Sequence, residues 1–148
     1  MKRHAAVICL SAALTGAASQ PAGARSTSPA SEAAKVRAIV VQEVRLYNQK
    51  RWRAQWRLFT PRVRSHCSYQ RFLVVTRSIR NAYGVMRLHR IAVRVTGRRG
   101  FAAYSVVLKG RLVATATAKN PDVFTRIGGR WFDDFDADGL CPSGDRPR

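Results

Sequence analysis

The sequence predicts an α+β domain in which three N-terminal helices pack on a strongly curved, mostly antiparallel sheet of four to five strands. Apolar residues recur at three- and four-residue intervals up to residue 83 and alternate with polar residues from residue 86 onwards. Short glycine-containing turns separate the alternating segments. Because the helices come first and antiparallel strands follow, we expect the helices to cover one face of the sheet.

Residues 1–24 have the pattern of a secretory signal peptide. A positively charged start (Lys2 and Arg3) precedes an apolar run over 5–14 and a triplet of small residues at 22–24. The apolar run is shorter than the roughly 20 residues that a membrane-spanning helix needs. We therefore expect export, with cleavage between Ala18 and Ala24 and a final location outside the cell or at the cell envelope.

The remaining 124 residues suit one domain with its own hydrophobic core. We predict a flexible leader over 25–30, a single domain over 31–141 and a C-terminal tail over 142–148.

Three amphipathic helices are predicted before Gly84. The first runs from Ser31 to Asn48, with Ser28 or Ser31 as its cap, and the third from a Ser68 cap to Tyr83. Between them, a helix that stops at Thr60-Pro61 carries three large rings at i, i+4 and i+7. We interpret the large aromatic residues of this region as core in preference to a ligand-binding set: Tyr47, Trp52, Trp56 and Phe59.

Alternating apolar and polar residues predict the strands. The expected ranges are 86–96, 101–108, 112–118, 123–127 and 130–135. The glycine pair at 128–129 predicts a two-residue hairpin between the last two strands.

Two cysteines, Cys67 and Cys141, remain after removal of the signal peptide, which carries Cys9. In an oxidising compartment an even pair is expected to form a disulfide. A bridge across 74 positions would stabilise the fold by roughly 4 kcal/mol through loop closure.

The chain is strongly basic, with 27 Lys and Arg against 8 Asp and Glu and a formal net charge of +19. The arginines are spread along the chain, and no nucleic-acid-binding motif is found in it. We therefore expect salt-sensitive, nonspecific attraction to anionic envelope polymers, and no specific nucleic-acid partner.

Three segments carry a resemblance to a known family. They are the helical opening that reaches Tyr47, the stretch RWRAQWRLFTP at 51–61 and the closing GGRW at 128–131. In this order, and over most of residues 31–136, they resemble the nuclear transport factor 2-like (SnoaL-like) superfamily, particularly its exported bacterial members of unassigned role. The resemblance implies a cystatin-like cone with a pocket at its open end. The superfamily contains isomerases, dehydratases, cyclases and non-enzymatic modules, and many members form homodimers through the sheet.

Candidate catalytic residues follow from the needs of proton transfer, which requires a base and a facing donor. Glu43 is the one acid of the first helix that lies far enough along to approach a pocket, and His89 shares the strand parity of Ile91. Tyr47 and Tyr104 are candidate donors. A structural or exposed role for His89 is the competing interpretation.

The acidic C-terminal segment matches the spacing of a calcium loop, with Asp134, Asp136, Asp138 and Asp145 as candidate ligands. Calcium is thus the one cofactor that the sequence raises. The alternative is that these acids pair with neighbouring arginines at the exit of the last strand.

Together these features favour a non-catalytic extracytoplasmic module that binds a small apolar ligand or a protein partner. Two alternatives stay open: a small-molecule isomerase or dehydratase that uses the pocket, and a nonspecific polyanion binder. A pocket lined by convergent polar groups with shifted pKa values would favour the enzyme.

Overall fold

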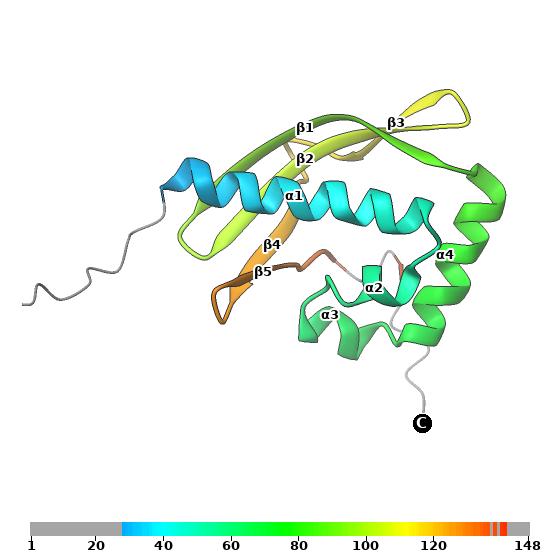
Figure 1. The fold of residues 1–148 in the computed structure, drawn as a ribbon, viewed down its shortest axis with the longest axis horizontal. Helices are drawn as coiled ribbons and strands as arrows, with labels where there is room; N and C mark the ends of the chain where they lie inside the picture. The colour runs from blue at the N-terminus through cyan, green and yellow to red at the C-terminus, as the bar shows by residue number, and fades with distance from the viewer. Residues whose placement is uncertain (1–27, 137, 139, 142–148) are drawn as a thin grey trace, which may run out of the picture.

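The computed structural model describes residues 28–136, 138, 140 and 141. The predicted signal peptide, the first half of the predicted leader (25–27) and the predicted tail lie outside these residues. Among the described residues, four helices precede five strands, and the helices pack on a strongly curled antiparallel sheet, which confirms the predicted fold class (Figure 1). The arrangement is compatible with a cone.

Helix α1 spans Pro29–Asn48 and begins two residues before the predicted start. The Ser28 side chain accepts a hydrogen bond from the Ser31 amide, and Pro29 occupies the first turn, where its missing N–H costs nothing. At the other end of α1, the Asn48 side-chain amide donates a hydrogen bond to the Met86 carbonyl at 2.7 Å and accepts one from the Met86 amide at 2.9 Å. This clamp fixes the end of α1 to the first strand.

The described residues contain one helix more than the three predicted, because a further short helix follows the predicted second helix, which stops at Thr60-Pro61. Helix α2 covers Trp52–Trp56 and helix α3 covers Pro61–His66. Thr60-Pro61 ends one helical segment but begins another, because the Thr60 hydroxyl caps the amide of Val63 and Pro61 lies in the first turn. Helix α4, Tyr69–Tyr83, agrees with the prediction in its Ser68 cap and its Gly84 end.

The strands are β1 (Met86–Thr96), β2 (Arg99–Leu108), β3 (Arg111–Ala116), β4 (Asp122–Ile127) and β5 (Arg130–Asp133). Strand β2 is central: β1 pairs along it, while β3 and β4 pair with its C-terminal and N-terminal halves respectively. Strands β4 and β5 form the predicted Gly128-Gly129 hairpin, in which both glycines have positive φ. The branching of β3 and β4 from opposite ends of β2 accompanies the strong curl of the sheet.

The buried side chains form two clusters. In the first, α1 lies on the sheet, with Val36 and Val40 against Ala102, Phe124 and Trp131. The second joins the short helices to the C-terminal segment, and its buried members are listed here: Phe59, Val63, Cys67, Phe72 and Cys141.

The predicted disulfide lies inside the second cluster. Cys67 and Cys141 are bonded, with their Cα atoms 5.5 Å apart and both side chains buried. The bridge ties the end of α3 to the segment that follows β5. Within the described part of the chain, no helix is long and apolar enough to cross a membrane.

Candidate functional site

A cavity of about 270 Å³, here called the central cavity, lies between α1, α2, α4 and the concave face of the sheet. One wall is apolar and is formed by Phe59, Phe72, Ile79, Met86, Phe135 and Leu140. The rest of the lining is mostly polar, and its acidic members are Glu43, Asp122 and Asp133. Ligand pockets typically combine an apolar lining with a few convergent polar groups in this way.

Among the polar lining residues, Glu43 and Asp133 form a hydrogen-bonded carboxyl pair. They are 8% and 4% exposed, and they approach from α1 and from the end of β5. Burial, together with the repulsion of Asp133, raises the pKa of Glu43 well above its usual value. Burial and the nearby Asp122 raise the pKa of Asp133 to about 8. The pair therefore retains at least one proton at neutral pH, and it can both donate and accept a proton.

The backbone holds Asp133 in place from two sides. Its amide donates to the Leu58 carbonyl at 2.9 Å, and its carbonyl accepts from the Thr60 amide at 2.8 Å, which joins β5 to the connection between α2 and α3. Its carboxylate also accepts from the Phe135 amide at 3.1 Å. The position of this acid is therefore set by main-chain bonds and not by a mobile side chain.

Tyr104 and Asp122 form the second polar unit of the cavity. The Tyr104 hydroxyl, on β2, donates to the Asp122 carboxylate, at the start of β4, across 2.6 Å. Burial raises the pKa of Asp122, and the hydrogen bond from Tyr104 opposes that shift. Burial, followed by the charge of Asp122, raises the pKa of Tyr104, so the phenol stays protonated and acts as a donor.

Two buried acceptor atoms on the cavity lining lack a protein partner. They are one carboxyl oxygen of Glu43, Oε1, and the side-chain oxygen of Gln55. A buried polar atom without a hydrogen bond is costly and calls for an explanation in a native structure. Both residues line the same cavity, and a bound molecule with donor groups that reaches these atoms would satisfy them.

The structure brings together several of the residues predicted from sequence. Glu43, Tyr47, Tyr104 and Phe59 all line the central cavity. The Tyr47 hydroxyl donates to the Gly84 carbonyl at 3.1 Å, and burial raises its pKa. Trp52 and Trp56 are instead half-buried and pack against the second core cluster.

His89 lies outside the cavity. It is exposed, and its Nδ1 atom is 3.4 Å from the Ser105 hydroxyl. The register of β1 against β2 shifts between Leu88 and Arg90, so His89 is an inserted residue and the expected parity with Ile91 does not hold.

Sequence analysis does not single out Asp122 and Asp133, although the necessary signal is present. Asp122 is two residues before the buried Phe124, and Asp133 is two residues after the buried Trp131. Alternation along a strand places residues two apart on the same face. Both acids could therefore have been assigned to the inner face of the sheet.

The three predicted calcium ligands that the structure describes, Asp134, Asp136 and Asp138, have contacts with other groups of the protein. Both carboxylate oxygens of Asp134 are engaged, one by Thr60 and Arg62 and the other by Thr125. The Asp138 Oδ1 atom lies 3.0 Å from the His66 Nε2 atom. Asp145 lies outside the described residues. Residues 28–136, 138, 140 and 141 include no group of three or more His, Cys, Asp or Glu that could hold a metal ion.

No protein-family model matches the chain, and no curated protein matches it in sequence. The chemistry of the central cavity is therefore inferred from its geometry. A proton-sharing carboxyl pair, a fixed phenol and an apolar wall together can bind a small organic molecule and move a proton on it.

Proposed function

We propose that this protein is an exported member of the nuclear transport factor 2-like superfamily whose central cavity performs acid–base chemistry on a small molecule, in the manner of an isomerase or dehydratase. The observation that carries this proposal is the Glu43–Asp133 pair, which is buried, shares a proton and borders a cavity large enough for a ligand. Convergent polar groups with shifted pKa values are typical of catalytic pockets.

Each member of the pair has a distinct role in this proposal. Asp133, with a pKa of about 8, is partly ionised near neutral pH and serves as the base that takes a proton from a carbon beside a carbonyl group. Glu43 is protonated and serves as the acid that gives a proton to the carbonyl oxygen, so an enol forms. Asp133 then returns its proton to a different carbon while the enol hydroxyl returns its proton to Glu43, which completes an isomerisation and restores both acids.

Solvent deuterium exchange tests this proposal without knowledge of the product. The purified protein is incubated in D₂O with a panel of small carbonyl compounds, and loss of C–H signals is followed by NMR. We expect at least one compound to exchange with the wild-type protein, and the rate to fall about 100-fold or more in Asp133→Asn. The matched control is Asp136→Asn, because Asp136 is exposed and does not line the cavity. Exchange that is equal in the wild type and Asp133→Asn would contradict the proposal.

The second candidate is a non-catalytic module that holds a small ligand in the same cavity, and the wall of six apolar side chains favours it. Binding of apolar compounds without deuterium exchange in any member of the panel would support this candidate. Both candidates share the proposed location outside the cytoplasm. The buried Cys67–Cys141 disulfide supports that location, because such bonds persist in oxidising compartments.

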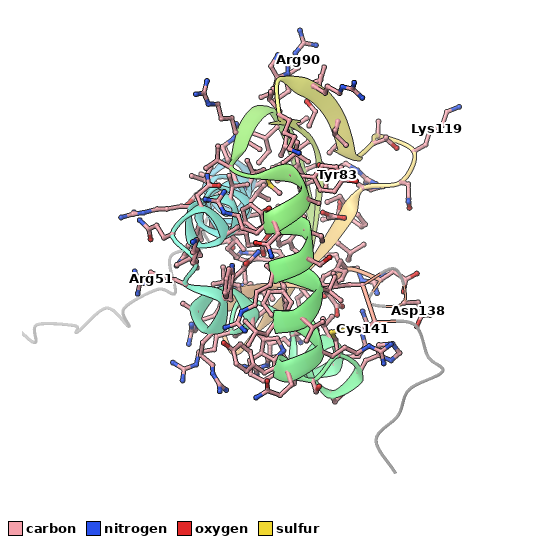
Figure 2. All side chains as sticks on the ribbon, turned by 90° about the vertical axis from the view of Figure 1, so that its right-hand side faces the viewer. Arg51, Tyr83, Arg90, Lys119, Asp138 and Cys141 are labelled. Carbon is pink, nitrogen blue, oxygen red and sulfur yellow. A yellow bond between two sulfur atoms is a disulfide. The ribbon has the colours of Figure 1, made fainter. Side chains whose placement is uncertain are left out.

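The basic exterior supports association with anionic envelope polymers in either case. Arg51, Arg90 and Lys119 extend from different sides of the molecule (Figure 2). Positive charge distributed in this way favours nonspecific attraction over recognition at one defined face.

A further inference from the structure

We propose that the ligand of the central cavity is a small organic cation, an ammonium compound with an apolar body. This inference rests on the proposed function only in taking the cavity as the place where the small molecule binds. It adds the charge and the hydrogen-bonding character of that molecule.

The distribution of charge around the cavity is the first observation. The chain has 27 basic and 8 acidic residues, yet the described residues that line the cavity include three acids and no lysine, arginine or histidine. Arg80 of α4 lies close to one lining residue, Tyr47, with its guanidinium carbon 5.6 Å from the centroid of the Tyr47 ring. Arg80 itself does not line the cavity. The lining of this cavity is thus acidic, although the protein as a whole is strongly basic.

The unpartnered atoms of the lining are the second observation, and they are independent of the net charge. Glu43 Oε1 and Gln55 Oε1 are both acceptors, both are buried, and both lack a hydrogen bond. Glu43 as a whole is only 8% exposed. A ligand that brings N–H donors would satisfy both atoms, whereas a ligand that brings only acceptors would leave them unpaired.

An ammonium group fits these acceptors better than a metal ion does. Carboxylates also bind metals, but no group of three or more potential ligands in the described part of the chain is arranged to hold one. An ammonium group has three donors on one atom and needs no fixed coordination shell. Its positive charge would also stabilise ionised carboxyl groups that otherwise repel one another.

The size and apolar wall of the cavity limit the rest of the ligand. A volume of about 270 Å³ equals the share of about nine water molecules in the liquid. Phe59, Phe72 and Phe135 make edge-to-face contacts along the apolar wall, with centroids 5.1 to 5.3 Å apart. We therefore expect a compact amine with one ring or a short branched chain.

Matched probes test this inference on the wild-type protein. The probes are 2-phenylethylamine and 2-phenylethanol, which share size and shape and differ in charge, with phenylacetate as the anion. We expect the amine to bind at least about ten-fold more tightly than the alcohol, and phenylacetate to bind more weakly than both. Calorimetry in two buffers of different ionisation enthalpy should also show proton release at pH 7.

Proton release is expected because the cation favours the ionised form of the carboxyl pair. The titratable groups that face this pair are Tyr47 from α1, Tyr104 from β2 and Asp122 from β4, while Asp134 points away and acts on Asp133 only through its charge, and Arg80 lies over the Tyr47 ring from α4. The two tyrosines have raised pKa values and stay neutral at pH 7. The released proton therefore comes from the acids of the cavity, which are Glu43, Asp122 and Asp133.

The double variant Glu43→Gln/Asp133→Asn locates the binding site. It keeps the shape of the pair but removes its charge, so the amine should lose at least about ten-fold in affinity while the alcohol is unchanged. Asp136→Asn is the control, and it should leave both affinities unchanged because Asp136 is exposed.

Three outcomes would overturn the inference: equal binding of amine and alcohol, no binding of the amine, or amine binding that Asp136→Asn weakens and the double variant does not. None of these depends on catalysis, so the deuterium exchange experiment judges the proposed reaction separately. Selective amine binding without exchange would remove the reaction and leave the cationic ligand in place.

Discussion

Asp133 and Asp134 are consecutive residues whose carboxyl groups have opposite surroundings. Asp133 points into the central cavity, where burial raises its pKa to about 8. Although partial burial opposes it, hydrogen bonds from Thr60, Thr125 and Arg62 hold the pKa of Asp134 below its usual value. The alternation of the strand sends the two neighbours in different directions, and their effects on stability differ in sign.

The Asp133 carboxyl should make the fold less stable as pH rises. Between about pH 4 and pH 8 the unfolded chain has lost this proton and the folded protein keeps it, so the free energy of unfolding falls with increasing pH. Asp133→Asn should flatten this fall and stabilise the protein at pH 8 by on the order of 2 kcal/mol. Urea unfolding at pH 5 and pH 8 measures both effects. A wild-type stability that rises from pH 5 to pH 8, with no difference between the two proteins, would contradict the assignment.

Asp134→Asn should have the opposite effect. The ionised Asp134 carboxylate accepts three hydrogen bonds, and one of them comes from an arginine. Loss of the charge should cost about 1–2 kcal/mol of unfolding free energy at pH 7. Because the folded pKa is lowered, the wild-type advantage should shrink as pH falls below about 4 and vanish once pH passes below the folded pKa. The same urea experiment, extended to pH 3, checks this result, and an advantage at pH 3 as large as at pH 7 would be inconsistent with it.

Tyr104→Phe should expose the dependence of Asp122 on its single phenol donor. The variant removes the 2.6 Å hydrogen bond to a largely buried carboxylate, at a cost of about 1–3 kcal/mol. Tyr83→Phe is the matched control, since Tyr83 is 51% exposed. Thermal unfolding of the two variants compares them directly, and equal melting temperatures would show that the Asp122–Tyr104 bond contributes nothing.

At the scale of elements, the closeness of α1 to the sheet depends on one glycine. A Cβ atom on Gly100 of β2 would lie 2.8 Å from a methyl carbon of Val36 on α1 and 3.3 Å from Phe124 of β4. The absence of a side chain at Gly100 therefore lets the helix and the two strands meet at the first core cluster. The same contact fixes the position of α1, which carries Glu43 to the cavity.

Gly100→Ala should destabilise the protein by about 1–3 kcal/mol, because overpacking pushes α1 away from the sheet. Val36→Ala removes the methyl groups that clash, so the double variant should lose less stability than the sum of the two single variants. Ala92→Val is a control on the neighbouring strand, since Ala92 is exposed. Additive losses in the double variant would contradict the proposed contact.

At the scale of the whole molecule, one covalent link joins the helical half to the C-terminal end. The Cys67–Cys141 bridge lies among the aromatic residues of the second core cluster, and His66 beside it contacts the Cys141 carbonyl at 2.9 Å. Leu140 and Phe135, which precede Cys141, line the central cavity. The bridge therefore also holds part of the cavity wall.

The double variant Cys67→Ala/Cys141→Ala should lose roughly 4 kcal/mol of unfolding free energy by the loop-closure estimate for a separation of 74 residues. Denaturant unfolding measures this loss. Mass spectrometry of the non-reduced wild-type protein is the companion experiment, and two cysteines that react with an alkylating reagent would show that the bridge is absent.

The sequence by itself determined the fold class, the helix caps at Ser68 and Gly84, the glycine hairpin and the cysteine pair, because each depends on local periodicity or on residue type. It left the cap of the first helix open between Ser28 and Ser31, and the structure assigns it to Ser28. The sequence also indicated Glu43, Tyr47 and Tyr104 as candidates. The β1 bulge that turns His89 outward and the second role of Thr60 as a helix cap depend on pairing across the sheet and packing against β5.

Only the tertiary structure decided which acids meet. Glu43, Asp122 and Asp133 are far apart in the chain, and their proximity comes from the curl of the sheet and from backbone bonds between β5 and the segment before α3. Strand alternation assigns a side chain to a face, but it does not say which side chains on that face come within hydrogen-bonding distance. The proton shared by Glu43 and Asp133 is therefore a property of the fold, since it requires two buried carboxyl groups in contact.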